Sequence, residues 1–148
     1  MKKILGFFAA FLMFASFNAN AQELKNGPYL EVNKEVHDYG TIEKGGDPYC
    51  EFTVTNSGTE PLIISNAKGS CGCTVPEWDR EPIMPGKTSK IKVRYDTQRV
   101  GPINKTVTLT SNATNEPTKT IRIKGNVKPE AASKAPVKEE GLSPKANG

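Results

Sequence analysis

The chain has 148 residues, of which 36% are hydrophobic and 24% charged, and its formal net charge is +4. This length accommodates one domain, and the ordinary fraction of charged residues excludes a wholly disordered chain. A single histidine in the sequence leaves little material for acid–base catalysis.

The N-terminal segment has the three parts of a secretory signal. Two lysines open the chain, an apolar run follows over residues 4–17, and residues 19–21 spell the A-x-A pattern of a signal peptidase site. As a helix this run reaches about 21 Å, against a hydrocarbon core of roughly 30 Å, so it is too short for a membrane anchor. We therefore expect a signal peptide over residues 1–21, cleavage before Gln22, and export to the periplasm, envelope or exterior of a bacterium, with no membrane span afterwards.

Removal of the signal changes the composition of the chain. It takes away five of the six phenylalanines and two lysines, so the net charge of +4 becomes +2. The remaining chain is nearly neutral and has no aromatic residues between its clustered cations, so it does not predict nucleic-acid binding.

Residues 27–127 alternate between apolar and polar side chains with the period of two that half-buried strands require. The clearest case is 90–95, where Ile91, Val93 and Tyr95 alternate with cations. Further strands are expected at 30–32, 36–42, 50–55, 62–64, 105–111 and 119–127. About seven short strands separated by turn-forming residues predict a single all-β domain, an antiparallel β-sandwich. We expect its core to contain Phe52, Trp78, the four tyrosines and the alternating aliphatic residues.

The C-terminal segment has a different composition. Residues 128–148 contain three prolines, many alanines, lysines and glutamates, and no aromatic residue. Such a segment cannot bury enough surface to offset its backbone entropy, so we predict a disordered tail.

The most unusual local feature is the Cys71-Gly72-Cys73 sequence. In an extended strand the two Cα atoms lie about 6.6 Å apart, at the upper edge of disulfide geometry. Gly72 permits a tighter bend, so a strained bridge can form, and strained bridges are the exchangeable ones. A thiol–disulfide exchange site in an oxidising compartment is therefore one hypothesis.

Cys50 is the third cysteine. Its parity with Phe52 and Val54 places it on the core face, which indicates a buried thiol. The alternative is that Cys50 pairs with Cys71 or Cys73 and leaves one thiol free.

A metal site is a weaker hypothesis. Cys50, Cys71, Cys73 and His37 together make a Cys₃His set, but C-x-C is narrower than the usual zinc spacing and His37 reads more simply as a strand residue. A two-thiolate site for a soft ion such as Cu(I) is easier to build from Cys71 and Cys73 alone. No cofactor is expected, and the sequence contains no nucleophile elbow, phosphate loop or H-E-x-x-H motif.

Three motifs carry a family resemblance: Asn56-x-Gly58-x-x-Pro61, Ser70-Cys71-Gly72-Cys73-Thr74-x-Pro76-x-Trp78 and Pro82-Ile83-x-Pro85-Gly86. Over most of residues 33–127 the chain resembles the bacterial exported proteins of domain of unknown function family 1573. The resemblance implies an immunoglobulin-like fold similar to ASH and major-sperm-protein modules, which generally act as protein-binding scaffolds. It also implies motif or structural roles for eight residues: Asn56, Gly58, Pro61, Gly72, Thr74, Trp78, Pro85 and Gly86.

Two residues depart from the family pattern. His37 stands where the family tends to have an aromatic residue, which implies a packing role, and Cys50 is additional.

We expect a non-enzymatic, exported immunoglobulin-like module that binds a protein or an envelope component. The alternative is a thiol-redox or soft-metal protein that uses Cys71 and Cys73.

Overall fold

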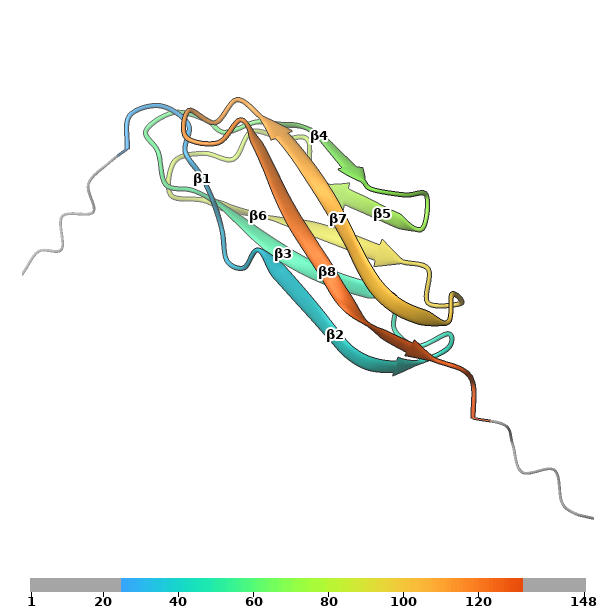
Figure 1. The fold of residues 1–148 in the computed structure, drawn as a ribbon. Helices are drawn as coiled ribbons and strands as arrows, with labels where there is room; N and C mark the ends of the chain where they lie inside the picture. The colour runs from blue at the N-terminus through green and yellow to red at the C-terminus, as the bar shows by residue number, and fades with distance from the viewer. Residues whose placement is uncertain (1–24, 132–148) are drawn as a thin grey trace, which may run out of the picture.

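The computed structural model describes residues 25–131, which form two β-sheets packed face to face (Figure 1). The predicted signal peptide and residues 132–148 of the predicted tail lie outside the described residues. Eight strands follow one another along the chain: β1 (Leu30–Val32), β2 (Val36–Glu43), β3 (Tyr49–Asn56), β4 (Ile64–Gly69), β5 (Thr74–Trp78), β6 (Thr88–Tyr95), β7 (Gly101–Ser111) and β8 (Thr118–Lys128).

The strands are shared equally between the two sheets. One has the order β1-β3-β6-β5 and the other β2-β8-β7-β4. The predicted all-β sandwich is confirmed, but the prediction that all its strands are antiparallel is wrong, because β2 runs parallel to β8. β1 and β2 follow each other along the chain, which crosses from the first sheet to the second at residues 33–35. β2 therefore runs in the same direction as β1.

The structure differs from the sequence-based prediction in one additional strand and in the ends of two elements. The eighth strand, β5, was not predicted. It contains Pro76, which is tolerated here because β5 is an edge strand. In the predicted strand 62–64, Leu62 makes only an isolated bridge to Ile83, and β4 begins at Ile64. Residue 128, the first of the predicted tail, is the last residue of β8, and its carbonyl accepts a 2.9 Å hydrogen bond from the Lys44 amide.

The core lies between the sheets and follows the predicted alternation. Phe52, Ile91 and Val93 have no exposed surface, and Ile121 and Ile123 are 1% exposed. Of the predicted aromatic residues, Tyr95 is buried in the core, Tyr39 and Trp78 pack against it partly buried, and the prediction for Tyr49 is wrong. Tyr49 is 42% exposed, since it has the opposite parity to Phe52 and points out of the sheet.

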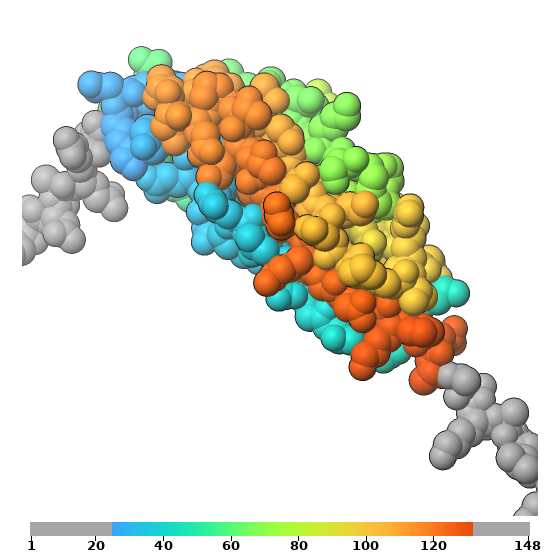
Figure 2. Space-filling view, in the orientation of Figure 1, coloured from blue at the N-terminus to red at the C-terminus, as the bar shows by residue number. Residues whose placement is uncertain are grey.

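The described part of the chain enters at one end of the sandwich and leaves at the opposite end (Figure 1). In the same orientation, the side chains of β2, β8 and β7 form one continuous surface (Figure 2). No helix long and apolar enough to cross a membrane occurs within residues 25–131.

Candidate functional site

Asn56, the first residue of the predicted motifs, is fully buried at one end of the sandwich. Its side-chain oxygen accepts hydrogen bonds from the amides of Tyr29 and Gly58, at 3.3 and 3.0 Å. Its side-chain nitrogen donates to the carbonyls of Glu60 and Ile83, at 2.7 and 2.8 Å. These four bonds join three separate backbone segments, so the side-chain amide of Asn56 has a structural role.

The other motif residues at this end are also structural. A Cβ on Gly58 would lie 1.9 Å from the Gly27 carbonyl oxygen, so no larger residue fits without backbone movement. Gly86, which follows Pro85 in a turn, has a φ of 75° and donates its amide to the Asn56 carbonyl at 2.8 Å. The Pro61 carbonyl accepts a 3.1 Å bond from the Asn112 side chain.

Trp78 connects the two sheets. It lies at the end of β5, and its indole nitrogen donates to the carbonyl of Ile64 in β4 at 3.0 Å. The guanidinium of Arg80 covers the ring at 5.1 Å from its centroid. Trp78 therefore has a structural partner for both its polar and its aromatic part.

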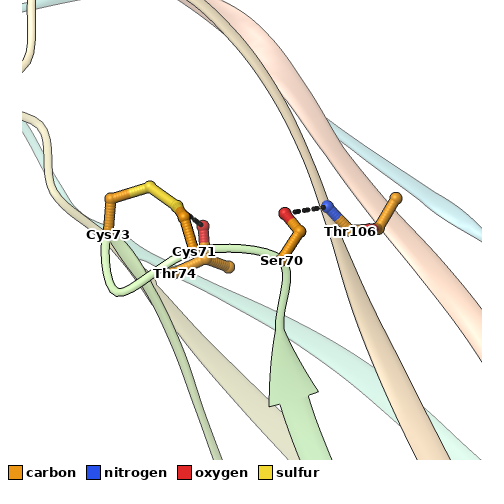
Figure 3. The surroundings of a disulfide bond; sticks show 5 residues. All are labelled: Ser70, Cys71, Cys73, Thr74 and Thr106. Carbon is orange, nitrogen blue, oxygen red and sulfur yellow. Dashed lines mark hydrogen bonds between the residues drawn. A yellow bond between two sulfur atoms is a disulfide. The ribbon is translucent and has the colours of Figure 1, made fainter.

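Residues 70–73, which we call the cysteine loop, carry the chain from β4 in one sheet to β5 in the other (Figure 3). Ser70 fixes the start of the loop, because its amide donates to the Thr106 carbonyl at 2.9 Å and its hydroxyl accepts from the Thr106 amide at 3.2 Å. A Cβ on Gly69 would lie 1.9 Å from the Thr74 carbonyl oxygen, so the two ends of the loop are in direct contact.

A disulfide joins Cys71 and Cys73, and their Cα atoms are 5.3 Å apart. This distance is shorter than that of an extended strand because the loop turns, and the Thr74 amide donates to the Cys71 carbonyl at 3.2 Å. The bend that the sequence predicted at Gly72 is therefore present. Gly72 itself is exposed, and apart from the adjacent Cys71 and Cys73 no residue has a heavy atom within 4 Å of the position its Cβ would take.

The two sulfur atoms share one buried hydroxyl. Thr74 is 2% exposed, and its Oγ1 lies 3.7 Å from the sulfur of Cys71 and 3.7 Å from that of Cys73. A dashed line in Figure 3 marks the contact with Cys71. Cys73 is 7% exposed, whereas Cys71 lies at the margin of the core and is only partly buried.

Cys50 does not belong to this site. It lies on β3, which β6 separates from β5, so two strand spacings of about 4.8 Å put it well beyond the roughly 7 Å that a disulfide can span. Its thiol is free and buried. Burial raises the pKa of Cys50, and burial likewise raises the pKa of the neighbouring Tyr39, whose hydroxyl donates to the Pro48 carbonyl at 2.9 Å.

The residues considered for a metal site are not assembled as one. His37 packs edge-on against Tyr39, with ring centroids 4.8 Å apart, which agrees with a packing role. Among residues 25–131 no group of three or more His, Cys, Asp or Glu side chains is placed to hold a metal ion. Cys71 and Cys73 offer thiolates to a soft ion such as Cu(I) only after their bridge has been reduced.

The outer face of the β1-β3-β6-β5 sheet carries a feature that the sequence reasoning missed. Register places Val75, Arg94 and Tyr49 in one line across β5, β6 and β3, and we call them the Tyr49–Arg94–Val75 row. Tyr49 and Val75 are each 42% exposed. The opposite parity of Tyr49 and Phe52 was the signal that could have revealed this row.

Charges on this face are unevenly paired. In the next line across the same strands, Lys92 lies between Glu77 and Glu51. Glu51 accepts a 2.8 Å hydrogen bond from Lys90, which lowers the pKa of the Glu51 carboxyl. Arg94 has no ion pair within the described residues, so its guanidinium is available to a ligand.

The described part of the chain has two shallow hollows that are large enough to note. One, of about 400 Å³, lies on the outer face of the β2-β8-β7-β4 sheet and adjoins the cysteine loop at Ser70. It is lined by Asn66, Lys68, Gly69, Ser70, Thr106, Thr108 and Thr110. The other, of about 210 Å³, lies near Ile83 and Met84 at the opposite end of β5.

Two four-stranded sheets with this order of strands define an immunoglobulin-like β-sandwich. Residues 30–127 match the family model described as protein of unknown function (DUF1573), and the chain belongs to that family. A search of curated proteins found no match.

Solved structures are similar in fold. A protein of unknown function from Porphyromonas gingivalis W83 has a TM-score of 0.61 at 19% identity, over 75% of this chain and 51% of its own, so the chain spans about half its length. The ASH / PapD-like domain 7 of human CEP192 has a TM-score of 0.54 at 14% identity, over 69% of this chain and 86% of its own. The VesB protease of Vibrio cholerae has a TM-score of 0.54 at 18% identity, over 66% of this chain and 31% of its own. At these identities the similarity shows the fold alone.

Proposed function

We propose that the protein is an exported, non-enzymatic binding module whose outer β1-β3-β6-β5 face holds a protein or cell-envelope partner. The observation that carries this proposal is the Tyr49–Arg94–Val75 row. An aromatic ring and an aliphatic side chain, each 42% exposed, lie on either side of an arginine that has no ion pair in the described chain.

The chemistry of this row suits recognition. Tyrosine and arginine are enriched among the residues that dominate binding energy, because both bury a large area and still form directed hydrogen bonds. The Lys92 ammonium lies 4.1 Å from the centre of the Tyr49 ring, which holds that ring in place. Since three paired strands fix the backbone beneath the row, little backbone entropy is lost on binding. The complementary partner has a carboxylate next to an apolar surface.

The edges of this sheet favour binding through the face over binding by strand addition. At the β1 edge, the Asn115 side chain bonds both the amide and the carbonyl of Leu30, each at 2.9 Å. At the β5 edge, Pro76 has no amide hydrogen, and the Thr74 amide is already bonded to Cys71. Both edges are therefore poor templates for another strand.

The experiment compares two charge reversals at equivalent places on the two sheets. Arg94→Glu alters the proposed face, and Arg122→Glu alters the outer face of the other sheet, where Arg122 lies between Thr106 and Val36. Immobilised protein is exposed to envelope extract from the source bacterium, and the retained components are quantified. We expect Arg94→Glu to lose at least about ten-fold in retention of a specific partner, with Arg122→Glu unchanged. Equal retention by both variants refutes the assignment of this face.

Export is tested separately. The mature protein should begin at Gln22, because the signal peptidase pattern ends at residue 21. N-terminal sequencing of protein from the periplasmic or culture fraction measures this directly, and an intact N-terminus in every fraction contradicts export through this signal.

A second candidate function is thiol–disulfide exchange or soft-metal handling at the cysteine loop. The observation that favours it is a closed Cys71–Cys73 bridge on a turn whose middle residue, Gly72, is open to solvent. A soft-metal role would use the reduced pair, and titration of the reduced protein with Cu(I) tests it.

A further inference from the structure

We propose that the Cys71–Cys73 bridge is a directional exchange site: an incoming thiolate attacks the Cys71 sulfur, and Cys73 leaves as a thiolate that the Thr74 hydroxyl holds. This inference rests on the second candidate function above and adds the order of events, the positioning residue and the class of substrate. Cys50 takes no part, because it is buried and lies two strands away.

The hydrogen bonding of Thr74 is the first support. Within residues 25–131 its hydroxyl has the two sulfur atoms as its only partners, each at 3.7 Å, although Thr74 is 2% exposed. A disulfide sulfur is a weak acceptor, so this buried hydroxyl is poorly satisfied in the oxidised protein. A thiolate in the same place is a charged acceptor and forms a much stronger bond. The Thr74 hydroxyl therefore favours the opened bridge and offsets part of the desolvation that burial imposes on a Cys73 thiolate.

Exposure sets the direction of attack. Cys73 is 7% exposed and belongs to the core, whereas Cys71 is only partly buried at its margin. Exchange depends on which sulfur an attacking thiolate can reach, so Cys71 is the electrophile and Cys73 the leaving group. The leaving thiolate then forms inside the fold, next to the Thr74 hydroxyl.

Two features of the loop admit a second chain. Gly72 places no side chain over the bridge, and no residue other than the two cysteines comes within 4 Å of the position that its Cβ would take. Val75, which follows Thr74 directly, begins the Tyr49–Arg94–Val75 row. A polypeptide bound on that row thus lies next to the bridge, and the substrate class is a protein or peptide that carries cysteine thiols.

The exchange balances with such a substrate. Its first thiolate forms a bond to the Cys71 sulfur, the Cys71–Cys73 bond breaks, and its electron pair stays on Cys73 as a thiolate. A second substrate thiolate then attacks the substrate sulfur of this mixed disulfide, and Cys71 leaves as a thiolate. The substrate dithiol has become a disulfide and the cysteine pair a dithiol, which returns to the bridge by the reverse reaction with another disulfide compound.

The direction is tested with oxidised glutathione as the probe. Cys73→Ser leaves the more exposed Cys71 as a free thiol, and Cys71→Ser leaves the buried Cys73. We expect Cys73→Ser to form the glutathione mixed disulfide at least about ten-fold faster, measured by mass after acid quenching, with circular dichroism to verify folding. Equal rates, or a faster Cys71→Ser, overturn the direction. In wild-type protein quenched during reduction by glutathione, the adduct should map to Cys71, and an adduct on Cys73 overturns the proposal even if the variants do not fold.

The role of Thr74 is tested by equilibrium with a glutathione redox buffer. Thr74→Val removes the hydroxyl at nearly constant volume, and Thr74→Ser keeps it. We expect Thr74→Val to shift the equilibrium about ten-fold toward the bridge, which is about 30 mV for a two-electron couple, and Thr74→Ser to stay near wild type. If Thr74→Val and Thr74→Ser behave alike, the hydroxyl has no such role. If the wild-type bridge does not exchange with glutathione at all, the exchange function itself fails, and the two failures are distinguishable.

Discussion

The side-chain amide of Asn56 donates a 2.8 Å hydrogen bond to the carbonyl of Ile83, a residue 27 positions further along the chain. The same side chain, which is itself fully buried, bonds three other backbone groups, and the bond from the Gly58 amide is also buried. Four backbone groups thus depend on one side chain, and the two in buried bonds, the Gly58 amide and the Ile83 carbonyl, are costly to leave without a partner.

We predict that Asn56→Ala lowers the free energy of unfolding by about 3 kcal/mol or more, since four backbone groups, two of them in buried bonds, lose their partner at once. Urea denaturation followed by circular dichroism measures the change. Asn66→Ala is the matched control, because Asn66 is exposed on β4 and should shift stability by no more than about 0.5 kcal/mol. Similar losses for both variants would show that Asn56 is not the centre of this end of the sandwich.

Substitution by alanine should destabilise the protein at one motif glycine and have little effect at another. A Cβ at Gly58 meets the Gly27 carbonyl oxygen at 1.9 Å, whereas a Cβ at Gly72 meets no residue within 4 Å other than the adjacent Cys71 and Cys73. We predict that Gly58→Ala destabilises the domain by roughly 1–3 kcal/mol or more, because backbone must move, and that Gly72→Ala leaves thermal stability nearly unchanged. A large loss of stability in Gly72→Ala would mean that this glycine serves the fold instead of leaving the bridge uncovered.

The fold could be predicted from the sequence because one face of each sheet is buried, which makes apolar and polar residues alternate along the strands. The alternation of Ile91, Val93 and Tyr95 with cations predicts β6 and its inner face directly. The parallel pairing of β2 was not accessible, since alternation carries no information on strand direction. The strand around Pro76 was missed because its edge position comes from the assembled sheet and not from the local sequence.

The three cysteines should differ sharply in reactivity. Cys50 is free but buried, and burial raises its pKa, while Cys71 and Cys73 are bonded to each other. We predict no maleimide label on the native oxidised protein, one label after unfolding, and three after unfolding with reductant, read by mass. Labelling of Cys71 or Cys73 in the unfolded, unreduced protein would contradict the pairing in the structure.

The candidate site was only partly predictable. The spacing of Cys71 and Cys73 indicated a bridge, and the parity of Cys50 indicated burial, but no local pattern decided between the alternative pairings. That decision depends on β6 lying between β3 and β5. The Thr74 hydroxyl was likewise hidden, because its contact with both sulfurs depends on how tightly the loop turns. Tyr49 was assigned to the core from its residue type, although its parity indicated the outer face.

His37 should make stability depend on pH near neutrality. Its pKa is lowered from the ordinary value of 6.5, first by burial and then by the Lys34 ammonium, which lies 2.9 Å from Nδ1, with Asp38 acting weakly in the opposite direction. The unfolded chain binds a proton at His37 more readily than the folded protein does. The contribution of neutral His37 to the free energy of unfolding is therefore fully present above pH 6.5, and it is lost as the pH falls through the lower pKa of the folded protein. We predict that the urea midpoint falls over this window in wild type but stays flat in His37→Gln. The carboxyl groups of Asp38 and Glu51 also have lowered pKa values, but their effect belongs to a lower range, below their ordinary values of 3.8 and 4.5. A wild-type midpoint that is constant from neutral pH down to that lower range would rule out the effect of His37.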